Sequence, residues 1–367
     1  MLPQLSRRGF LEAAMVAIAA EAAADEPAAR PAPIRIAQIG VRHGHATKLR
    51  IYRDSPDYEV VGVVEPDADA RRRAEDDPAF AGLPWMTREQ LLAVPGLQAV
   101  LVETGVPDLL DAAEACVEAG KHVHLDKPAG TSLPQYRRIL ATAAQRQLVV
   151  QMGYMYRYNP AIVMLRQAVA EGWLGEIFEI HAVMGKVLDP ADRLLLAGYP
   201  GGMMLELGCH LIDLAVGVLG RPDRVVGFSR HVSPVDDGLE DSMLAVLEYP
   251  RATATIRTAA VDVDGFARRQ FTVCGTAGTF HVQPLDSPSV RLTLARSRGG
   301  YEAGTQEVKL PKYTRYVADA AEMARAIRGE APFPFSHDHD LAVQAAVLEA
   351  CGLPLDGRSG PPQPRGS

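Results

Sequence analysis

Between residues 34 and 150, short apolar runs alternate with segments whose apolar residues recur at helical spacing. The runs predict buried strands at 34–39, 59–64, 97–102 and 122–125. The helical spacing predicts helices at 46–53 and 108–119, the second closed by a glycine. This alternation is typical of an α/β domain built on a parallel sheet.

A different pattern begins near residue 176, where several segments alternate apolar and polar residues with a period of two and turn residues stand between them. These segments predict strands at 176–183, 224–228, 243–249, 252–261, 270–273 and 290–294. We therefore predict that a second, sheet-rich domain follows the first.

A glycine-containing loop, Gly40-Val41-Arg42-His43-Gly44-His45, joins the first predicted strand to the first helix. Glycines there let the backbone approach a pyrophosphate at a helix N-terminus. Glu65 ends the second strand about 20 residues after Gly44, the spacing of the acid that holds a ribose diol in Rossmann domains. A carboxylate at this position would repel a 2′-phosphate, so NAD is favoured. The arginines at 71–73 leave NADP open.

The loop departs from the G-x-G-x-x-G pattern at two positions. Arg42 stands where the pattern has Gly, and His45 stands where it has Gly or Ala. Arg42, His43 and His45 could donate hydrogen bonds to phosphate instead. A metal site built on His43 and His45 is the alternative, but the sequence places no third ligand beside them, so we expect no metal.

The composition is that of a folded, acidic chain. The 367 residues include 38 Lys and Arg against 45 Asp and Glu, a net charge of −7, and 47% of them are hydrophobic. Disordered chains are less apolar, and a nucleic-acid-binding chain would need a basic face. The length favours two domains. Four widely spaced cysteines without a C-x-x-C pair argue against a disulfide scaffold or a zinc knuckle.

The first 24 residues are typical of an export signal. Residues 6–11 read SRRGFL and resemble the twin-arginine motif, an Ala-rich stretch follows, and residues 22–24 offer an A-x-A cleavage site. The longest uncharged run in this segment has eight residues, too few to span a membrane, so we expect no stable membrane insertion. Residues 25–33 predict a linker and residues 353–367 a disordered tail. We expect a periplasmic or otherwise exported protein that folds before export.

Three motifs, in order, carry a family resemblance. Residues 119–128 read AGKHVHLDKP, residues 151–160 read QMGYMYRYNP, and residues 201–213 read GGMMLELGCHLID. They resemble motifs of the Gfo/Idh/MocA family of oxidoreductases, and the resemblance covers nearly all of residues 34–352. It implies a Rossmann domain at 34–153, then an α/β domain at 154–352 with a large, open, mainly antiparallel sheet. It also implies a homodimer or homotetramer formed through that sheet.

The resemblance implies that Lys127 and His210 form a catalytic pair. A histidine can take and return the proton of a substrate hydroxyl, and an ammonium group can stabilise the developing alkoxide. Glu206 would position the substrate or hold His210 in the required tautomer. The bond between Lys127 and Pro128 is often cis in related proteins, which would aim the lysine into the cleft.

The chain departs from the family pattern at four positions, where Gly105, Leu109, Asp126 and Glu206 replace the usual Pro, His, Glu and Asp. Even so, the loops after the predicted strands supply the expected cofactor contacts. These are Gly40, Arg42, His43, Gly44, His45, Glu65, Thr104, Asp126, Lys127 and Pro128.

Residues of the second and third motifs supply most of the expected substrate contacts, which are Tyr154, Tyr156, Arg157, Lys186, Glu206 and His210. Tyr154, Tyr156 and Tyr158 alternate, and in an extended segment they would share a face able to line a sugar site, with core packing as the alternative. Arg157 could instead hold structure or cofactor. Asp213 shares the helical spacing of Glu206 and His210, and we expect a structural role for it.

A further charged segment, His337-Asp338-His339-Asp340, directly precedes a predicted helix at 341–350. Its residue types could ligate a metal. We favour an N-cap formed by Asp338 or Asp340.

Together these patterns predict an exported NAD(P)-dependent oxidoreductase that acts on a sugar, cyclitol or related polyol and keeps its cofactor bound. Because free nucleotide is scarce outside the cytoplasm, the cofactor would have to be reset in place. A redox-neutral glycoside hydrolase or lyase, acting through transient oxidation of a sugar, is the second hypothesis. A non-catalytic sugar-binding protein that has lost the nucleotide is the third.

Overall fold

A computed structural model describes residues 31–356, and a parallel sheet, sheet A, organises the first part of them. Its strands follow the order β2-β1-β3-β4-β5. They are β1 (Ile34–Ile39), β2 (Tyr58–Val64), β3 (Ala99–Val102), β4 (His122–Leu125) and β5 (Val150–Met152). The intervening helices are η1 (Ala46–Lys48), α2 (Leu49–Asp54), α3 (Ala68–Glu75), α4 (Arg88–Leu92), α5 (Val106–Glu118) and α6 (Leu133–Gln145).

Local sequence explains where the longer helices of this part begin and which face they bury. Both α5 and α6 carry a proline in the first turn, where a missing N–H costs no hydrogen bond. The side chain of Ser132 accepts a hydrogen bond from the N–H of Gln135 and caps α6. Helix α5 buries Leu109, Ala113 and Cys116 against strands β3 and β4. Helix α5 therefore packs on sheet A with the apolar face that its sequence predicts.

A second sheet, sheet B, holds eight strands in the order β13-β12-β11-β10-β6-β9-β8-β7. All neighbouring strands are antiparallel except β6 and β9. The strands are β6 (Ile177–Gly185), β7 (Arg224–Arg230), β8 (Ser242–Glu248), β9 (Thr253–Ala259), β10 (Gln270–Gly275), β11 (Gly278–Val282), β12 (Val290–Leu294) and β13 (Gly304–Val308).

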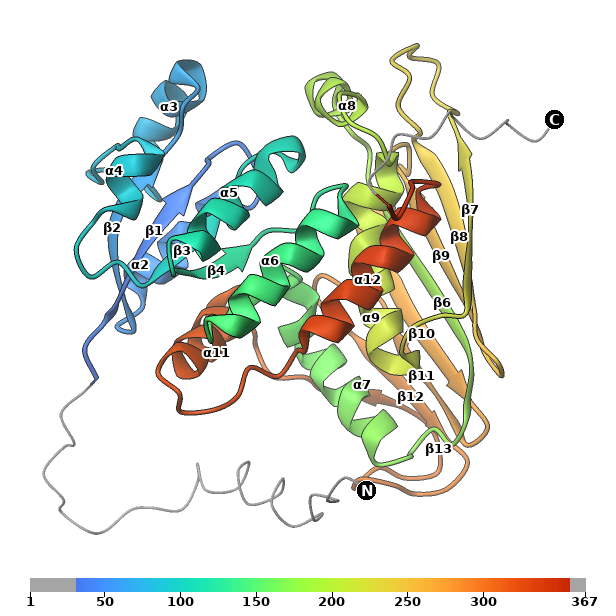
Figure 1. The fold of residues 1–367 in the computed structure, drawn as a ribbon. Helices are drawn as coiled ribbons and strands as arrows, with labels where there is room; N and C mark the ends of the chain where they lie inside the picture. The colour runs from blue at the N-terminus through green and yellow to red at the C-terminus, as the bar shows by residue number, and fades with distance from the viewer. Residues whose placement is uncertain (1–30, 357–367) are drawn as a thin grey trace, which may run out of the picture. The chain divides into compact units, whose positions relative to one another are not determined.

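Helices cover one face of sheet B. Figure 1 shows α7, α9 and α12 on the same side of its strands, and α12 packs against β7 and β8. Burial in β8 and β9 alternates, so that Ala245, Leu247, Ala254 and Ile256 lie under the helices. The helices of this part are η2 (Met155–Tyr158), α7 (Pro160–Ala170), α8 (Pro190–Ala197), the π-helical turn η3 (Met204–Gly208), α9 (Cys209–Leu219), α10 (Gly265–Arg268), α11 (Val317–Ile327) and α12 (His337–Ala350).

Helix α11 returns to the first sheet after the chain has completed sheet B. Its Ala320, Met323 and Ala324 join the buried cluster around β1 and β2. The hydroxyl of Tyr58 donates to the carbonyl of Ala320 at 2.7 Å. A segment near the end of the described chain therefore completes the core around sheet A.

The α/β fold class is confirmed, and most predicted strands agree with the structure within two residues. The predicted helix at 46–53 is divided into η1 and α2. Strands β5, β11 and β13 were not predicted. The signal segment 1–24 and most of the linker and tail lie outside the described residues. Within residues 31–356, no helix combines the length and apolar character that crossing a membrane requires.

Candidate functional site

The candidate site lies where the carboxyl ends of β1, β3 and β4 release their loops, the usual ligand position in open α/β sheets. Gly40 follows β1 with φ +92°, and a Cβ there would lie 2.5 Å from the backbone of Glu103 and Thr104. Only glycine fits this close approach. The loop after β1 therefore lies directly on the segment that follows β3.

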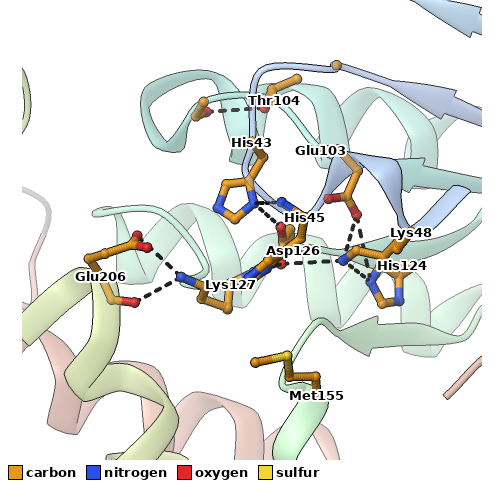
Figure 2. A network of polar contacts seen from close by, with 12 residues as sticks. His43, His45, Lys48, Glu103, Thr104, His124, Asp126, Lys127, Met155 and Glu206 are labelled. Atoms are coloured by element: carbon orange, nitrogen blue, oxygen red, sulfur yellow. Dashed lines mark hydrogen bonds and ion pairs between the residues drawn. The ribbon is translucent and has the colours of Figure 1, made fainter. Parts of the chain in front are cut away.

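Lys127 extends from the end of β4 towards the second half of the chain. Its ammonium donates to the backbone carbonyl of Glu206 at 2.9 Å and lies 3.2 Å from the Glu206 carboxylate (Figure 2). Burial acts to lower the pKa of Lys127, but its acidic neighbours together, Glu206 first, outweigh burial, so the pKa is raised. The Lys127-Pro128 peptide bond is cis. The lysine is thus a buried, charged donor next to the turn that carries the third motif.

Asp126, one residue earlier, faces the glycine loop. One carboxylate oxygen, Oδ2, contacts His43 Nδ1, and the other, Oδ1, lies 3.4 Å from His45 Nδ1. The backbone N–H of Lys127 donates to Oδ1 at 2.8 Å. Although burial acts to raise it, the cationic and imidazole groups around Asp126, His43 first, hold its pKa well below the usual range. Burial lowers the pKa of His45 to about 4, so this ring is neutral at neutral pH.

A polar network beneath this loop was not predicted from the sequence. The Lys48 ammonium lies 2.9 Å from Glu103 Oε1 and 3.0 Å from His124 Nε2 (Figure 2). Burial lowers the pKa of His124 to about 3, and its Nδ1–H donates to Gln151 at 2.9 Å. The only signal in the sequence was an ionisable residue in or next to each of three predicted elements. Lys48 also lies 3.6 Å from Asp126, so the network supports that carboxylate from below.

His210 is buried near the start of α9, among aromatic rings. The rings of Tyr156 and Tyr154 stand edge-on to it at centroid distances of 5.2 and 5.9 Å, and the His45 ring lies 6.4 Å away. Burial lowers the pKa of His210 well below its ordinary value. Its Nδ1 has no hydrogen-bond partner among the described residues. A neutral imidazole with a free nitrogen can accept a proton or a hydrogen bond from a ligand.

Glu65 and Arg42 mark the other end of the loop. The Glu65 carboxylate accepts hydrogen bonds from the N–H groups of Val41 and Asp67, both at 3.0 Å, and lies 3.8 Å from Arg42 Nε. Each oxygen keeps a second lone pair that a ribose hydroxyl can use. A Cβ built at Gly44 would meet nothing within 4 Å, so the loop is open there. These features fit a dinucleotide that runs from Glu65 to Lys127.

Two expected contacts lie at the edge of the cluster. The hydroxyl of Thr104, which follows β3, donates to the carbonyl of Gly105 at 3.2 Å. Lys186 lies 4.0 Å from Asp192. Burial acts to raise the pKa of Glu206, but the charge of Lys127 and, more weakly, that of Lys186 help to hold it below the ordinary value. Lys186 is thus close enough to Glu206 to act on it electrostatically.

Arg157 lies elsewhere, in a buried ion cluster. Its guanidinium donates to Asp213 and to Asp340, each at a shortest distance of 2.6 Å, and His339 lies 3.1 Å from Asp213. The positive charge of Arg157 is therefore paired with carboxylates on α9 and α12. This geometry fits the structural role expected for Asp213 and the structural role considered as the alternative for Arg157. The placement of Arg157 among the substrate contacts stays a prediction.

Two local predictions were wrong. The segment containing Tyr154, Tyr156 and Tyr158 is not extended, because Met155–Tyr158 forms a 3₁₀ helix. Tyr158 therefore turns to Gln151 and Phe335. The cap of α12 is also different from the prediction. Ser336, which precedes the charged segment, accepts a hydrogen bond from the N–H of His339 and forms the N-cap.

Known sequence families match both halves of the chain. The profile described as an oxidoreductase family with an NAD-binding Rossmann fold matches residues 34–154. The profile described as the GFO/IDH/MocA C-terminal domain matches residues 162–281. The first profile covers sheet A, and the second covers most of sheet B.

Curated relatives include trans-1,2-dihydrobenzene-1,2-diol dehydrogenase of Bos taurus, 28% identical over 56% of this chain and 60% of the relative. The uncharacterized oxidoreductase YdgJ of Escherichia coli is 29% identical over 71% of this chain and 79% of its own length. The chain spans about half to three fifths of the length of the dihydrodiol dehydrogenases of cattle, humans and pigs.

Among solved structures, UDP-N-acetylglucosamine 3-dehydrogenase GnnA from Acidithiobacillus ferrooxidans has a TM-score of 0.72 at 20% identity. The match covers 88% of this chain and 98% of that one. At this identity the likeness establishes a shared fold.

Proposed function

The chain belongs to the Gfo/Idh/MocA oxidoreductase family, and on that premise we propose that it transfers hydride between a sugar, cyclitol or related polyol and a tightly bound NAD(P). The observation that carries this proposal is the contact between Lys127 and Glu206. The buried ammonium of Lys127, at the end of β4, contacts the turn that directly precedes His210. A proton donor and a proton acceptor therefore lie at one site. When bound, the nicotinamide supplies the hydride acceptor or donor.

His210 and Lys127 divide the work on the substrate oxygen. In the oxidation direction, the neutral imidazole of His210 takes the hydroxyl proton, for which its unpartnered Nδ1 is available. The Lys127 ammonium donates a hydrogen bond to the oxygen as negative charge develops on it. In the reduction direction the same groups return the proton.

Glu206 and the two tyrosines act as positioning residues in this proposal. The Glu206 carboxylate and carbonyl both hold Lys127, which fixes the direction of its ammonium group. Tyr154 and Tyr156 restrict the His210 ring by edge-on contact. The Tyr156 hydroxyl donates to Asp286 at 2.8 Å, which anchors the tyrosine itself.

Residues at both ends of the glycine loop would hold the cofactor. Gly40 and Gly44 allow the pyrophosphate to approach the backbone, and Glu65 would accept hydrogen bonds from the adenosine ribose. The carboxylate favours NAD. Arg42, which lies beside Glu65, is the group that could meet a 2′-phosphate if NADP is bound.

We also propose export by the twin-arginine route with the cofactor already bound, and assembly through the open face of sheet B. The support for export is the SRRGFL motif. For assembly, the support is the face that the helices leave uncovered, together with the exposed rings of Phe178 on β6 and Phe228 on β7. Gel filtration with light scattering would test the assembly, and a monomer at micromolar concentration would contradict it.

The test of function begins with the purified full chain. After heat denaturation, mass spectrometry of the supernatant should detect nicotinamide nucleotide. Candidate polyols should then reduce the bound NAD(P), with persistent absorbance of the reduced ring until a carbonyl acceptor is added. Aglycone release without net reduction would instead support the redox-neutral hydrolase. If no nucleotide is present and none binds when added, the proposal is wrong.

Two variants assign the roles. Lys127→Ala and His210→Ala should each retain nucleotide and lose turnover, by about 100-fold or more. Glu75→Gln, on the exposed surface of α3, is the control and should behave as the wild type. Unchanged rates in either alanine variant would remove that residue from the site.

A further inference from the structure

His43, His45 and Asp126 converge on one point from two separate segments. The histidines belong to the loop after β1 and the aspartate ends β4, yet the three ligating atoms all lie within 4.8 Å of one another. The sequence offered His43 and His45 without a third ligand. Folding supplies it, because parallel strands deliver their carboxyl ends to the same edge of sheet A.

The donor set and its exposure suit a metal ion. Two imidazole nitrogens and one carboxylate are ligands that Zn²⁺, Fe²⁺ and related divalent ions take in proteins. The Asp126 side chain is fully buried, while those of His43 and His45 are 10% and 22% exposed. The cluster therefore has a buried anionic base and a side that solvent reaches, which gives an ion an entry path.

The contacts around the cluster place one carboxylate oxygen of Asp126 against His43 alone. Asp126 Oδ1 is held by the Lys127 N–H and approached by the Lys48 ammonium, whereas Oδ2 has no hydrogen-bond partner among residues 31–356. His43 Nδ1 faces Oδ2 and accepts the N–H of His45 at 3.3 Å. Two acceptor atoms that face each other need a cation or a proton between them.

The outer contacts also resemble those of metal sites. Carboxylate ligands are commonly held by further hydrogen bonds that fix their orientation. The N–H of Lys127 and the ammonium of Lys48 do this for Asp126 at Oδ1, the oxygen that His45 also approaches. Zn–N and Zn–O distances of about 2.0–2.2 Å imply ligand atoms about 3.3 Å apart. The three ligand atoms lie within 4.8 Å of one another, so the loop histidines would shift when the ion binds.

We propose that His43, His45 and Asp126 bind one divalent transition-metal ion, for which Zn²⁺ is the best match, with the fourth position open towards Lys127 and Glu206. Hydride transfer as proposed above does not require this ion. Its position next to the Lys127 ammonium would let it polarise a substrate oxygen as a Lewis acid. The site would also explain why His45 stands where the usual nucleotide loop has Gly or Ala.

Metal binding is tested on the purified full chain after dialysis against EDTA, with Zn²⁺ returned by equilibrium dialysis and counted by mass spectrometry. We expect about one Zn²⁺ per chain. His43→Ala and His45→Ala should each weaken binding by about 10- to 100-fold or more. The control is His231→Ala, a histidine far along the chain on the loop after β7, which should bind as the wild type. Co²⁺ in place of Zn²⁺ should give the visible absorption of a four-coordinate site in the wild type and in His231→Ala, but not in the two loop variants.

Three results would overturn the proposal. The wild type could take up less than 0.1 Zn²⁺ per chain, which would leave only a proton between His43 and Asp126. The His43→Ala/His45→Ala double variant could bind as the wild type does. His231→Ala could lose as much binding as the loop variants, which would indicate scattered surface histidines. Nucleotide binding, measured on the metal-free wild type, separates these outcomes from failure of the proposed function.

Discussion

The buried carboxyl group of Asp319 gives the stability of the protein a pH dependence that one substitution should remove. Asp319 lies on α11, is 3% exposed, and has a carboxyl oxygen without a partner among the described residues. Burial raises its pKa from 3.8 to about 7. At pH values between 3.8 and about 7, the Asp319 carboxyl is therefore protonated in the native state and ionised in the unfolded chain.

The sign and size of the effect follow from proton linkage. Between about pH 4 and pH 7 the native state binds more protons than the unfolded state, so the free energy of unfolding falls as pH rises. A shift from 3.8 to about 7 corresponds to about 4 kcal/mol, fully lost above the folded pKa. Asp319→Asn has no proton to lose, so it should remove this decline.

Urea unfolding of both proteins at a series of pH values between 4 and 8 measures the difference. Relative to the wild type, Asp319→Asn should gain about 2–4 kcal/mol of stability between pH 4 and pH 8. Glu75→Gln, an exposed carboxylate paired with Arg71, should show a flat difference within about 0.5 kcal/mol. A flat difference for Asp319→Asn as well would refute the reasoning, because it would mean that the carboxyl is ionised in the native state.

Three further substitutions test the site and its supports. Gly40→Ala should abolish nucleotide binding, because the φ of Gly40 is +92° and a Cβ would clash with the backbone after β3. The control is Gly82→Ala, where φ is +75° and the space is open. This variant should lose only about 1 kcal/mol of unfolding free energy and bind nucleotide normally. Asp213→Asn should cost about 3–5 kcal/mol in urea unfolding, because it leaves the buried guanidinium of Arg157 short of one carboxylate, yet the folded variant should keep its nucleotide. Glu206→Gln should lower turnover by about 10- to 100-fold with little change in nucleotide binding, since it removes only the charge that holds the Lys127 ammonium, and an unchanged rate would show that the carboxylate has no such role.

Much of the fold could be predicted because its physical signals are local. The buried parallel strand β3 is a continuous apolar run, and β1 is a mainly apolar segment between Pro33 and Gly40. Strands β11 and β13 lack that signal. β13 is a half-exposed edge strand whose sequence, GTQEV, has no apolar face, and β5 has only three residues. Whether such segments form strands depends on pairing with a neighbouring strand, and the segment's own sequence does not contain that information.

The site was predictable only in part, for a related reason. Lys127, Glu206 and His210 lie in recognisable motifs, and the structure brings the first two within 3.2 Å. The network of Lys48, Glu103 and His124 joins helix η1, the end of β3 and strand β4, so it exists only after sheet A forms. Asp126 was expected to contact the cofactor, which stays a prediction, and the sequence did not show that its carboxylate faces two histidines about 80 residues earlier.

Transfer of a labelled hydride tests the central claim most directly. A polyol that reduces the bound nucleotide would be prepared with deuterium on the reacting carbon and mixed with the protein for one turnover. The cofactor released by denaturation should then be heavier by one deuterium, and the same experiment with Lys127→Ala or His210→Ala should leave its mass unchanged. If the nucleotide of the wild type never gains deuterium from any polyol that binds, hydride transfer does not take place at this site.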